Sequence, residues 1–409
     1  MLRHPKACPP LLPRMVMMIP ALNTLFSDDS LLSVLRHAKL GVLCHAASTL
    51  NSGEHILDAL KRHDVPVTRI FSPEHGLWGA AQDMEGVSDN FDTIMQAPVT
   101  SLYGHALETL SPATDVIQDL DAVLIDIQDV GARYYTFVYT AWLLARAALE
   151  HGARVWFIDR PNPINASDVE GNLIDPRFHS FVGMRSVMTR HGMTAAELLK
   201  MWLEEDRTPN RDRFVPILMK DYDRKAYFDE TGARWFMPSP NMPTLDTAVI
   251  YPGMCLIEGT NLSEGRGTTR PFELFGAPWL NARATQDALN CLHLPGVLFR
   301  PLDFKPMFQK CAHTLCHGLE MRVTDRNAFK PLLTGVAILC VIHALHEAFE
   351  WRTQAYEFVH DRLAIDLLFG TDKIRKAIES HESPYKILEK MNEESASWRA
   401  QRNDALLYH

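Results

Sequence analysis

Long hydrophobic runs are absent from this sequence, and none approaches the roughly 20 consecutive apolar residues that a membrane-spanning helix needs. A short apolar patch at residues 15–19 is followed by Pro20, whereas a signal peptide needs an apolar core of about 7–15 residues. We therefore expect a cytoplasmic protein with a disordered extension at residues 1–24. Within that extension, Met15, Met17 and Met18 are alternative translation starts.

An excess of basic residues is also missing. Lysine and arginine total 41 against 50 aspartates and glutamates, so the formal net charge is -9. Nucleic acids and anionic membranes attract basic surfaces, and we expect neither as a partner. The hydrophobic content of 46% and the charged content of 22% are ordinary for a soluble globular protein, and the length suggests two domains.

Cysteine is scarce and carries no disulfide spacing. The chain has seven cysteines, an odd number that fits a reducing compartment better than an oxidising one. Zinc sites normally take their ligands from two separated pairs, so a cluster within seven residues is interpreted as structural. That cluster consists of Cys311, His313, Cys316 and His317. We predict no metal and no cofactor.

Several nucleotide-binding and hydrolase motifs are absent as well. Gly265 and Gly267 lack the third glycine of the dinucleotide fingerprint, because position 270 is arginine. No phosphate loop and no G-x-S-x-G nucleophile elbow occurs. A zinc-protease helix is excluded because Glu350 stands where the second histidine after His346 would be needed.

What the sequence does contain is an alternation of short apolar runs with helical patterns. Apolar strands separated by helices predict a mainly parallel sheet that helices cover on both faces, which is a doubly wound α/β fold. We assign this domain to residues 25–245. The expected strands are 40–44, 67–71, 122–127 and 154–158, and the expected helices are 31–38, 54–62 and 135–150.

The chain changes character after a proline-rich stretch at residues 235–243. The later pattern predicts a second, smaller α+β domain at residues 246–409, which completes a cleft with the first. Its expected helices are 245–257 and 331–351, its expected strands are 297–304 and 319–324, and its end is helical and charged.

Polar side chains concentrate at or just past the carboxyl ends of the expected strands. Ligands of open α/β sheets bind outside those ends, so this placement predicts the site. The residues placed there are His45, Glu74, His75, Asp126, Asp129, Asp159 and Arg160.

A second polar set lies at residues 258–273, which hold three carboxylates, two arginines, four hydroxyls and three glycines. Neither a helical nor a strand period runs through this segment, so it was not built to cover a core. A solvated turn would need a few glycines or asparagines, but not two arginines bracketed by acids. We interpret the segment as half of a binding site for a polar, anionic ligand.

The pair Glu74 and His75 is the strongest catalytic candidate. A proline before the pair and a glycine after it let the backbone turn past the strand end, so both side chains can reach one cleft. Burial among apolar side chains raises the pKa of a carboxyl group, which suits a general acid. The structural alternative is that Glu74 caps the following helix or pairs with an arginine.

A third set follows the strand at residues 122–127. A lone charge at Asp126 would be costly in a buried position, and Arg133 can pair with it. Alternatively, Arg133 binds a substrate carboxylate through a two-pronged hydrogen bond while Tyr134 and Tyr135 stack on a sugar. Glycoside cleavage needs two carboxylates across a cleft, and Asp83 adds one near Glu74. The same groups can hold a divalent cation, but no histidine pair has ligand spacing.

Four long segments resemble the exo-β-N-acetylmuramidase (NamZ-type) family, formerly a domain of unknown function. They read FSPEHGLWG at 71–79, DIQDVGARYYTF at 126–137, DRPNP at 159–163 and EGTNLSEGRGTTRPFE at 258–273. The resemblance runs in order from about residue 25 to 408 and implies a Rossmann-like domain with a smaller carboxyl-terminal domain. It also implies release of N-acetylmuramic acid from the non-reducing ends of peptidoglycan fragments, with the family's proposed catalytic glutamate at Glu74.

From the residues and the resemblance together we expect an exo-acting glycosidase of cell-wall turnover or recycling. Its expected substrate is a small carbohydrate, a disaccharide or muropeptide that ends in N-acetylmuramic acid. The alternatives are a metal-dependent hydrolase of another anionic substrate and a non-catalytic muropeptide-binding protein.

Glu74 is expected to act as general acid or nucleophile, with His75 orienting it or a substrate hydroxyl. The substrate's own acetamido oxygen is an alternative nucleophile. The second catalytic carboxylate is expected among Asp83, Asp129, Glu258 and Glu264. Because N-acetylmuramic acid carries a lactyl carboxylate, arginines are expected in the cleft. The expected substrate-binding residues are Asp126, Arg133, Tyr134, Tyr135, Asn162, Glu258, Asn261, Arg266 and Arg270.

Overall fold

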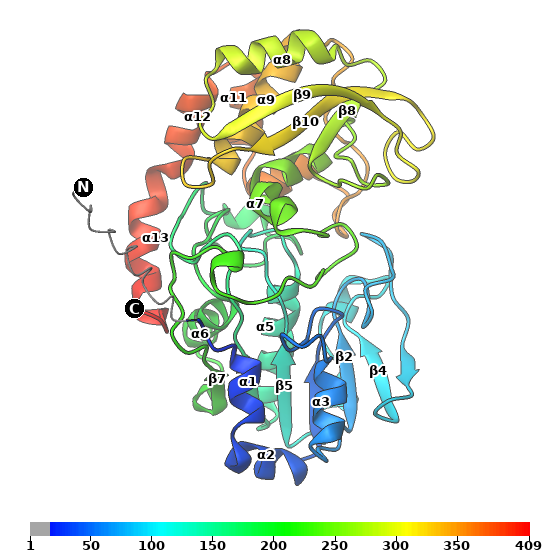
Figure 1. Ribbon diagram of the computed structural model, residues 1–409, viewed down its shortest axis with the longest axis vertical. Coiled ribbons are helices and arrows are strands. Elements are labelled where there is room, and N and C mark those ends of the chain that lie inside the picture. The colour runs from blue at the N-terminus through cyan, green and yellow to red at the C-terminus, as the bar shows by residue number, and fades with distance from the viewer. Residues whose placement is uncertain (1–16) are drawn as a thin grey trace, which may run out of the picture.

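The computed structural model describes residues 17–409, which form a large and a small sheet with their helices (Figure 1). The large sheet has seven strands in the order β3-β4-β2-β1-β5-β6-β7, and all neighbours are parallel except β3 and β4. Its strands are β1 (Leu40–Leu43), β2 (Arg69–Ser72), β3 (Asn90–Asp92), β4 (Ala97–Ser101), β5 (Ala122–Asp126), β6 (Arg154–Ile158) and β7 (Phe214–Ile217).

Successive side chains of the central strands enter two different hydrophobic cores. In β5, Val123 and Ile125 pack with α5 and α6, whereas Leu124 packs with α1, α2 and α3 on the other face. Both faces are therefore covered, which explains why these strands read as continuous apolar runs. The predicted doubly wound α/β fold is confirmed. The helices are α1 (Ala21–Phe26), α2 (Asp29–Arg36), α3 (Ile56–Arg62), α4 (Thr114–Ile117), α5 (Phe137–Glu150) and α6 (Ala195–Glu205).

Three strands of the large sheet, β3, β4 and β7, were not predicted. β3 and β7 are the two edge strands, and β4 is paired between β2 and the short strand β3. Pro98 in β4 and Pro216 in β7 interrupt the apolar pattern. Their sequences therefore lack the continuous apolar character that identified the central strands.

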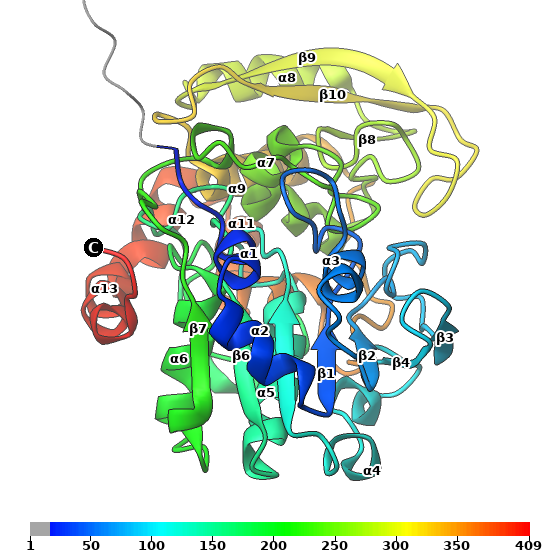
Figure 2. The ribbon, with the colours of Figure 1, turned by 60° about the horizontal axis from the view of Figure 1, so that its bottom comes forward.

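The second unit contains a three-stranded antiparallel sheet in the order β8-β10-β9 (Figure 2). The predicted helix at 331–351 is shorter than expected, because the chain becomes extended at His346. None of the helices within residues 17–409 combines the length and apolar character of a bilayer span. The elements are α7 (Leu245–Met254), β8 (Leu274–Ala277), α8 (Ala282–Cys291), β9 (Val297–Phe304), β10 (Cys316–Val323), α9 (Pro331–Leu345), α10 (Ala364–Phe369), α11 (Lys373–Glu379), α12 (Pro384–Met391) and α13 (Ser395–Arg402).

The predicted disordered extension at 1–24 needs a partial correction. Residues 1–16 lie outside the described residues. Residues 17–24 are instead packed on the large sheet: the backbones of Ile19 and Lys220 exchange two hydrogen bonds of 3.0 Å, and Met18 and Leu22 are buried. Met18, Ala21 and Leu22 belong to the hydrophobic core on the sheet face that α1 covers.

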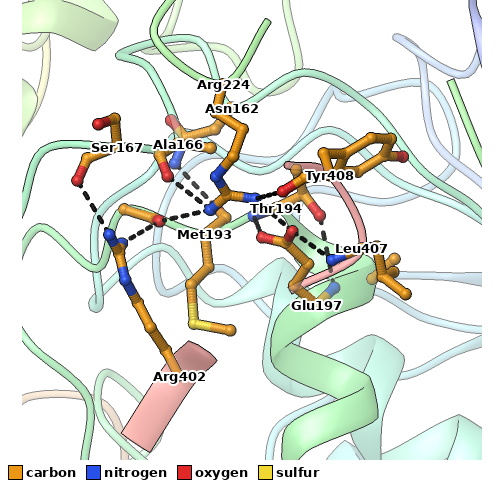
Figure 3. A network of polar contacts seen from close by, with 12 residues as sticks. Asn162, Ala166, Ser167, Met193, Thr194, Glu197, Arg224, Arg402, Leu407 and Tyr408 are labelled. Carbon is orange, nitrogen blue, oxygen red and sulfur yellow. Dashed lines mark hydrogen bonds and ion pairs between the residues drawn. The ribbon is translucent and has the colours of Figure 1, made fainter. Parts of the chain in front are cut away.

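The carboxyl-terminal tail returns from the second unit to the large sheet, and α13 lies near α6 (Figure 1). Tyr408 donates a hydrogen bond of 2.7 Å to Asp159, which follows β6, and Leu407 donates from its backbone to Glu197 at 2.9 Å. Glu197 is also paired with Arg224 (Figure 3). The tail therefore ties the two units together at the Asp159 end of the sheet.

Asp159 makes the stability of the fold dependent on pH. Burial raises its pKa to about 7, although hydrogen bonds from Thr194 and Tyr408 oppose this. The folded protein therefore keeps a proton that the unfolded chain loses near pH 4. The free energy of unfolding contributed by this group falls as pH rises from about 4 to 7. The largest possible loss is on the order of 4 kcal/mol.

We expect Asp159→Asn to flatten this part of the pH dependence, because asparagine has no proton to lose. Denaturant unfolding of both proteins between pH 4 and 8 measures the difference. Asp115→Asn is the control, since Asp115 is exposed on α4. Parallel curves for the parent protein and Asp159→Asn would show that Asp159 is not protonated in the fold.

Candidate active site

A cleft lies between segments that follow β2 and β5 and segments that follow α7. Both halves of the predicted site contribute to it, because the chain after the carboxyl ends of the strands meets the polar segment 258–273 here. The predicted residues that line the cleft are Glu74, His75, Asp83, Tyr134, Tyr135, Glu258 and Arg266.

Glu74 occupies the turn that follows β2. His75 has a φ of 72° and Gly76 a φ of 79°, so the backbone reverses directly after the strand. The Glu74 carboxylate accepts a hydrogen bond of 2.7 Å from the Thr136 hydroxyl and a longer one of 3.4 Å from the Met84 backbone. Among residues 17–409 no arginine pairs with Glu74, so the structural alternative of an arginine partner is not observed.

His75 is held in a left-handed conformation that disfavours side chains with a Cβ atom. Its Nδ1 lies 2.9 Å from the carbonyl oxygen of Ala81. A carbonyl can only accept, so Nδ1 carries the proton and Nε2 remains as an acceptor toward a ligand. Within the described residues no hydrogen bond joins His75 to Glu74, which leaves a substrate hydroxyl as its expected partner.

Arg266 gathers three carboxylates at one side of the cleft. Its guanidinium lies 3.0 Å from Glu258, 3.1 Å from Glu264 and 3.4 Å from Asp83. Burial disfavours the charge, but these carboxylates outweigh it and raise the pKa of Arg266 well above its ordinary value. Arg266 is therefore a permanent cation that holds the polar segment against the Asp83 loop.

The pKa values of Glu264 and Glu258 are shifted in opposite directions. Burial of Glu264 is outweighed by Lys310, 2.8 Å away, and by Arg266, so the pKa of Glu264 falls to about 2. Burial raises the pKa of Glu258, and Arg266 only partly offsets this. Tyr356 donates to Glu258 at 2.7 Å. Glu264 is therefore a fixed anion with a structural partner, and it does not suit proton transfer.

Arg133 does not bind Asp126 and does not serve as the expected carboxylate fork. It is fully buried and donates to the carbonyl oxygens of Asn172, Val187, Leu368 and Phe369 at 2.5–3.0 Å. Leu368 and Phe369 end α10, where the helix dipole is negative and attracts a cation. Arg133 is thus a structural residue that links the two units.

Asp126 and Asp129 also have structural partners in place of a substrate. Asp126 forms a two-pronged ion pair of 2.5 and 2.8 Å with Arg160. Asp129 accepts from the Gly131 backbone at 2.8 Å and lies 3.2 Å from His191. Neither carboxylate lines the cleft, and both have partners inside the large-sheet unit.

Three further residues that were expected to bind substrate form hydrogen bonds or ion pairs within the protein instead. The Asn162 side chain donates to Met193 and accepts from Ile164, and the Asn261 side chain donates to Ala348 and accepts from Glu350. Arg270 pairs with Glu273 and is over one third exposed on its side chain. These three residues stabilise loops next to the cleft and do not line it.

Sequence reasoning missed several residues that line the cleft. The most informative of them is Glu357, which lies in the segment between α9 and α10 and brings another carboxyl group into the cleft that Glu74 lines. The sequence of this segment has no clear helical or strand period, which is a weak signal of a functional loop. The predicted helix at 331–351 covered its first residues. The other lining residues that were missed include Thr136, Ser239, Asn241, Tyr251, Phe272 and Tyr356.

The cysteine and histidine cluster does not converge on one point. His317 Nδ1 lies 2.7 Å from Asp303, on the neighbouring strand β9. Within the described residues no three histidine, cysteine, aspartate or glutamate side chains gather at metal-ligand spacing.

Comparison with family models matches nearly all of the chain. The model described as exo-beta-N-acetylmuramidase NamZ, N-terminal, covers residues 40–246. The model described as exo-beta-N-acetylmuramidase NamZ, C-terminal, covers residues 249–408. The two matches together contain the large sheet, the small sheet and the cleft between them.

Individual proteins agree with these matches. The chain is 38% identical over 375 residues to the peptidoglycan beta-N-acetylmuramidase NamZ of Bacillus subtilis (strain 168), covering 91% of this chain and 88% of that protein. Two crystal structures of DUF1343 family proteins from Bacteroides fragilis NCTC 9343 are also similar. One has a TM-score of 0.83 at 26% identity, covering 97% of this chain and 100% of that chain. The other has a TM-score of 0.74 at 25% identity, covering 96% and 99%.

Proposed function

The chain belongs to the exo-β-N-acetylmuramidase NamZ family, and from this premise we propose how its cleft works. It is a glycosidase that releases N-acetylmuramic acid from the non-reducing ends of peptidoglycan fragments. The observation that carries the proposal is the position of Glu74 in the cleft. It follows the carboxyl end of β2 at a turn and lines the same cleft as Asp83, Glu258 and Glu357.

Glycoside cleavage needs one carboxyl group to protonate the leaving oxygen and another to attack or to activate water. Both oxygens of Glu74 accept hydrogen bonds, so the group presents acceptor oxygens to the cleft. We therefore assign Glu74 to the attacking or water-activating role. His75 presents Nε2 as an acceptor for a sugar hydroxyl, and the rings of Tyr134 and Tyr135 supply an apolar wall.

The lactyl carboxylate of the substrate needs a cation, and Arg266 is the guanidinium that lines the cleft within residues 17–409. Its Nε contact to Asp83 is its longest, at 3.4 Å. We propose that the lactyl group binds on this side and displaces Asp83, because a two-pronged contact with Arg266 is stronger than a long single one.

A chromogenic β-N-acetylmuraminide and the matching N-acetylglucosaminide test the function, each with and without a chelator. We expect cleavage of the muraminide alone and no effect of the chelator, because the carboxylates perform the chemistry and Arg266 selects the lactyl group. Loss of cleavage on chelation would indicate a metal-dependent hydrolase. Binding of muropeptides without turnover would indicate a binding protein.

The natural substrate is proposed to be a disaccharide or muropeptide with N-acetylmuramic acid at its non-reducing end. The expected cytoplasmic location stays a prediction, and fractionation of cells that express the protein at its natural level would test it.

A further inference from the structure

Glu357 lies at the tip of a tight turn whose backbone conformation its residues disfavour. The backbones of Tyr356 and Val359 exchange two hydrogen bonds, of 3.0 and 2.9 Å. The two residues between them, Glu357 and Phe358, have positive φ values of 46° and 67°. Turns with two positive φ values prefer asparagine and glycine, and each other residue costs about 1–2 kcal/mol there.

Packing holds this strained turn in place. The Phe358 ring lies 5.7 Å from Tyr103 and 6.5 Å from Phe181, between ring centroids, and Tyr103 lies 5.6 Å from Phe181. Tyr356 is fixed by its hydrogen bond to Glu258. A strained backbone that surrounding contacts hold in place is typical of active sites, where it positions a functional side chain.

The side chain so placed is a carboxyl group with one oxygen left free. Tyr103 donates a hydrogen bond of 3.1 Å to Oε2 of Glu357. No described residue donates to its Oε1, whereas both oxygens of Glu74 accept a hydrogen bond. Glu357 Oε1 can therefore carry a proton, while both oxygens of Glu74 already act as acceptors.

Electrostatics favours the protonated form of Glu357. Burial raises the pKa of Glu357 well above its ordinary value, and the charge of Glu74 raises it further, while Tyr103 lowers it. The other charged groups that act on Glu357 are Glu258 and Asp83, and both also raise its pKa. Two carboxyl groups whose surroundings favour opposite protonation states are the usual acid and base of a glycosidase.

We propose that Glu357 is the second catalytic carboxyl group and that it protonates the glycosidic oxygen, opposite Glu74. This inference rests on the proposed function. The bond from the anomeric carbon to the bridging oxygen breaks, its electron pair moves to that oxygen, and the proton of Glu357 joins it. The anomeric carbon takes an electron pair from a water oxygen, whose proton passes to Glu74. Solvent then returns a proton from Glu74 to Glu357.

Two substrates with different leaving groups test this assignment. A nitrophenyl muraminide releases a weakly basic anion that needs no proton, whereas the disaccharide of N-acetylmuramic acid and N-acetylglucosamine releases a sugar hydroxyl that does. We expect Glu357→Gln to lower kcat on the disaccharide by about 10²–10⁴-fold. The same variant should lose less than about tenfold on the nitrophenyl substrate, and the alkaline limb of the disaccharide pH profile should disappear.

Glu347→Gln is the matched control, because Glu347 is exposed in the same unit and lies outside the cleft. Equal losses on both substrates, or no loss on the disaccharide, would overturn the assignment. A parent protein that cleaves neither substrate would instead overturn the proposed function, and the Glu357 assignment with it.

Tyr103→Phe gives a second test that does not alter the strained turn. Phenylalanine keeps the ring packing and removes only the donor to Glu357, so the carboxyl group holds its proton more tightly. We expect the alkaline limb of the disaccharide profile to move to higher pH while the nitrophenyl profile stays in place. A structural role of Tyr103 would lower both activities without this shift, and that result would contradict the assignment.

Discussion

Glu74→Gln is expected to lower kcat/KM for every muraminide by about 10³-fold or more, because no leaving group replaces the lost base or nucleophile. Unlike Glu357→Gln, this variant should fail on the nitrophenyl substrate as well. The glutamine amide has nearly the size of the carboxylate, and its oxygen can still accept from Thr136. We therefore expect the thermal midpoint to change little.

The neighbouring carboxylate Glu85 provides the control for this prediction. Glu85 lies in the same loop, is exposed and accepts a hydrogen bond from the Gln82 backbone, which a glutamine oxygen can also do. Steady-state kinetics with both substrates should show near-parental activity for Glu85→Gln. Ordinary activity of Glu74→Gln would remove Glu74 from the mechanism and with it the proposed site.

Arg133→Met is expected to destabilise the fold by about 4 kcal/mol or more, since breaking a buried charged network typically costs 3–5 kcal/mol. The substitution leaves the carbonyl oxygens of Asn172, Val187, Leu368 and Phe369 without their donor. Burial lowers the pKa of Arg133 to about 10, so the group is still charged at neutral pH. A loss of this size is a large share of the stability of a typical domain.

Denaturant unfolding measures this effect, and Arg133→Lys covers the case in which the methionine variant does not fold. Lysine keeps the charge but reaches fewer carbonyls, so an intermediate loss is expected. Arg211→Met is the control, because Arg211 forms an exposed ion pair with Glu204 that is worth at most about 1 kcal/mol. If Arg133→Lys raised KM without lowering the stability, Arg133 would be a substrate-binding residue and its structural role would be contradicted.

The central strands and the Glu74 turn could be predicted because their signals are local. Strands β1, β2, β5 and β6 are buried on both faces, so each is a continuous apolar run that shows where the strand ends. In a parallel sheet the carboxyl ends share one edge, which brings Glu74 and His75 to the cleft. Strands β4 and β7 lacked this signal, since a proline interrupts the apolar run of each.

Arg133 shows where local reasoning was insufficient. Two of its four carbonyl partners lie in α10, 235 and 236 residues further along the chain. No pattern near residue 133 reveals that the end of a distant helix will approach it. A buried arginine that binds carbonyls and one that binds a substrate carboxylate have the same appearance in a sequence.

By itself the sequence determined the layered fold, the edge of the sheet that carries the site and the glutamate at that edge, because these follow from short-range hydrophobic and turn patterns. Only the tertiary structure decided which charges meet. It gave Asp126, Asp129 and Arg133 partners within the protein, and it placed Glu357 in the cleft with Glu74 from a turn whose positive φ values its residues disfavour. Burial and charge interactions depend on distance through space, and distance along the chain does not determine them.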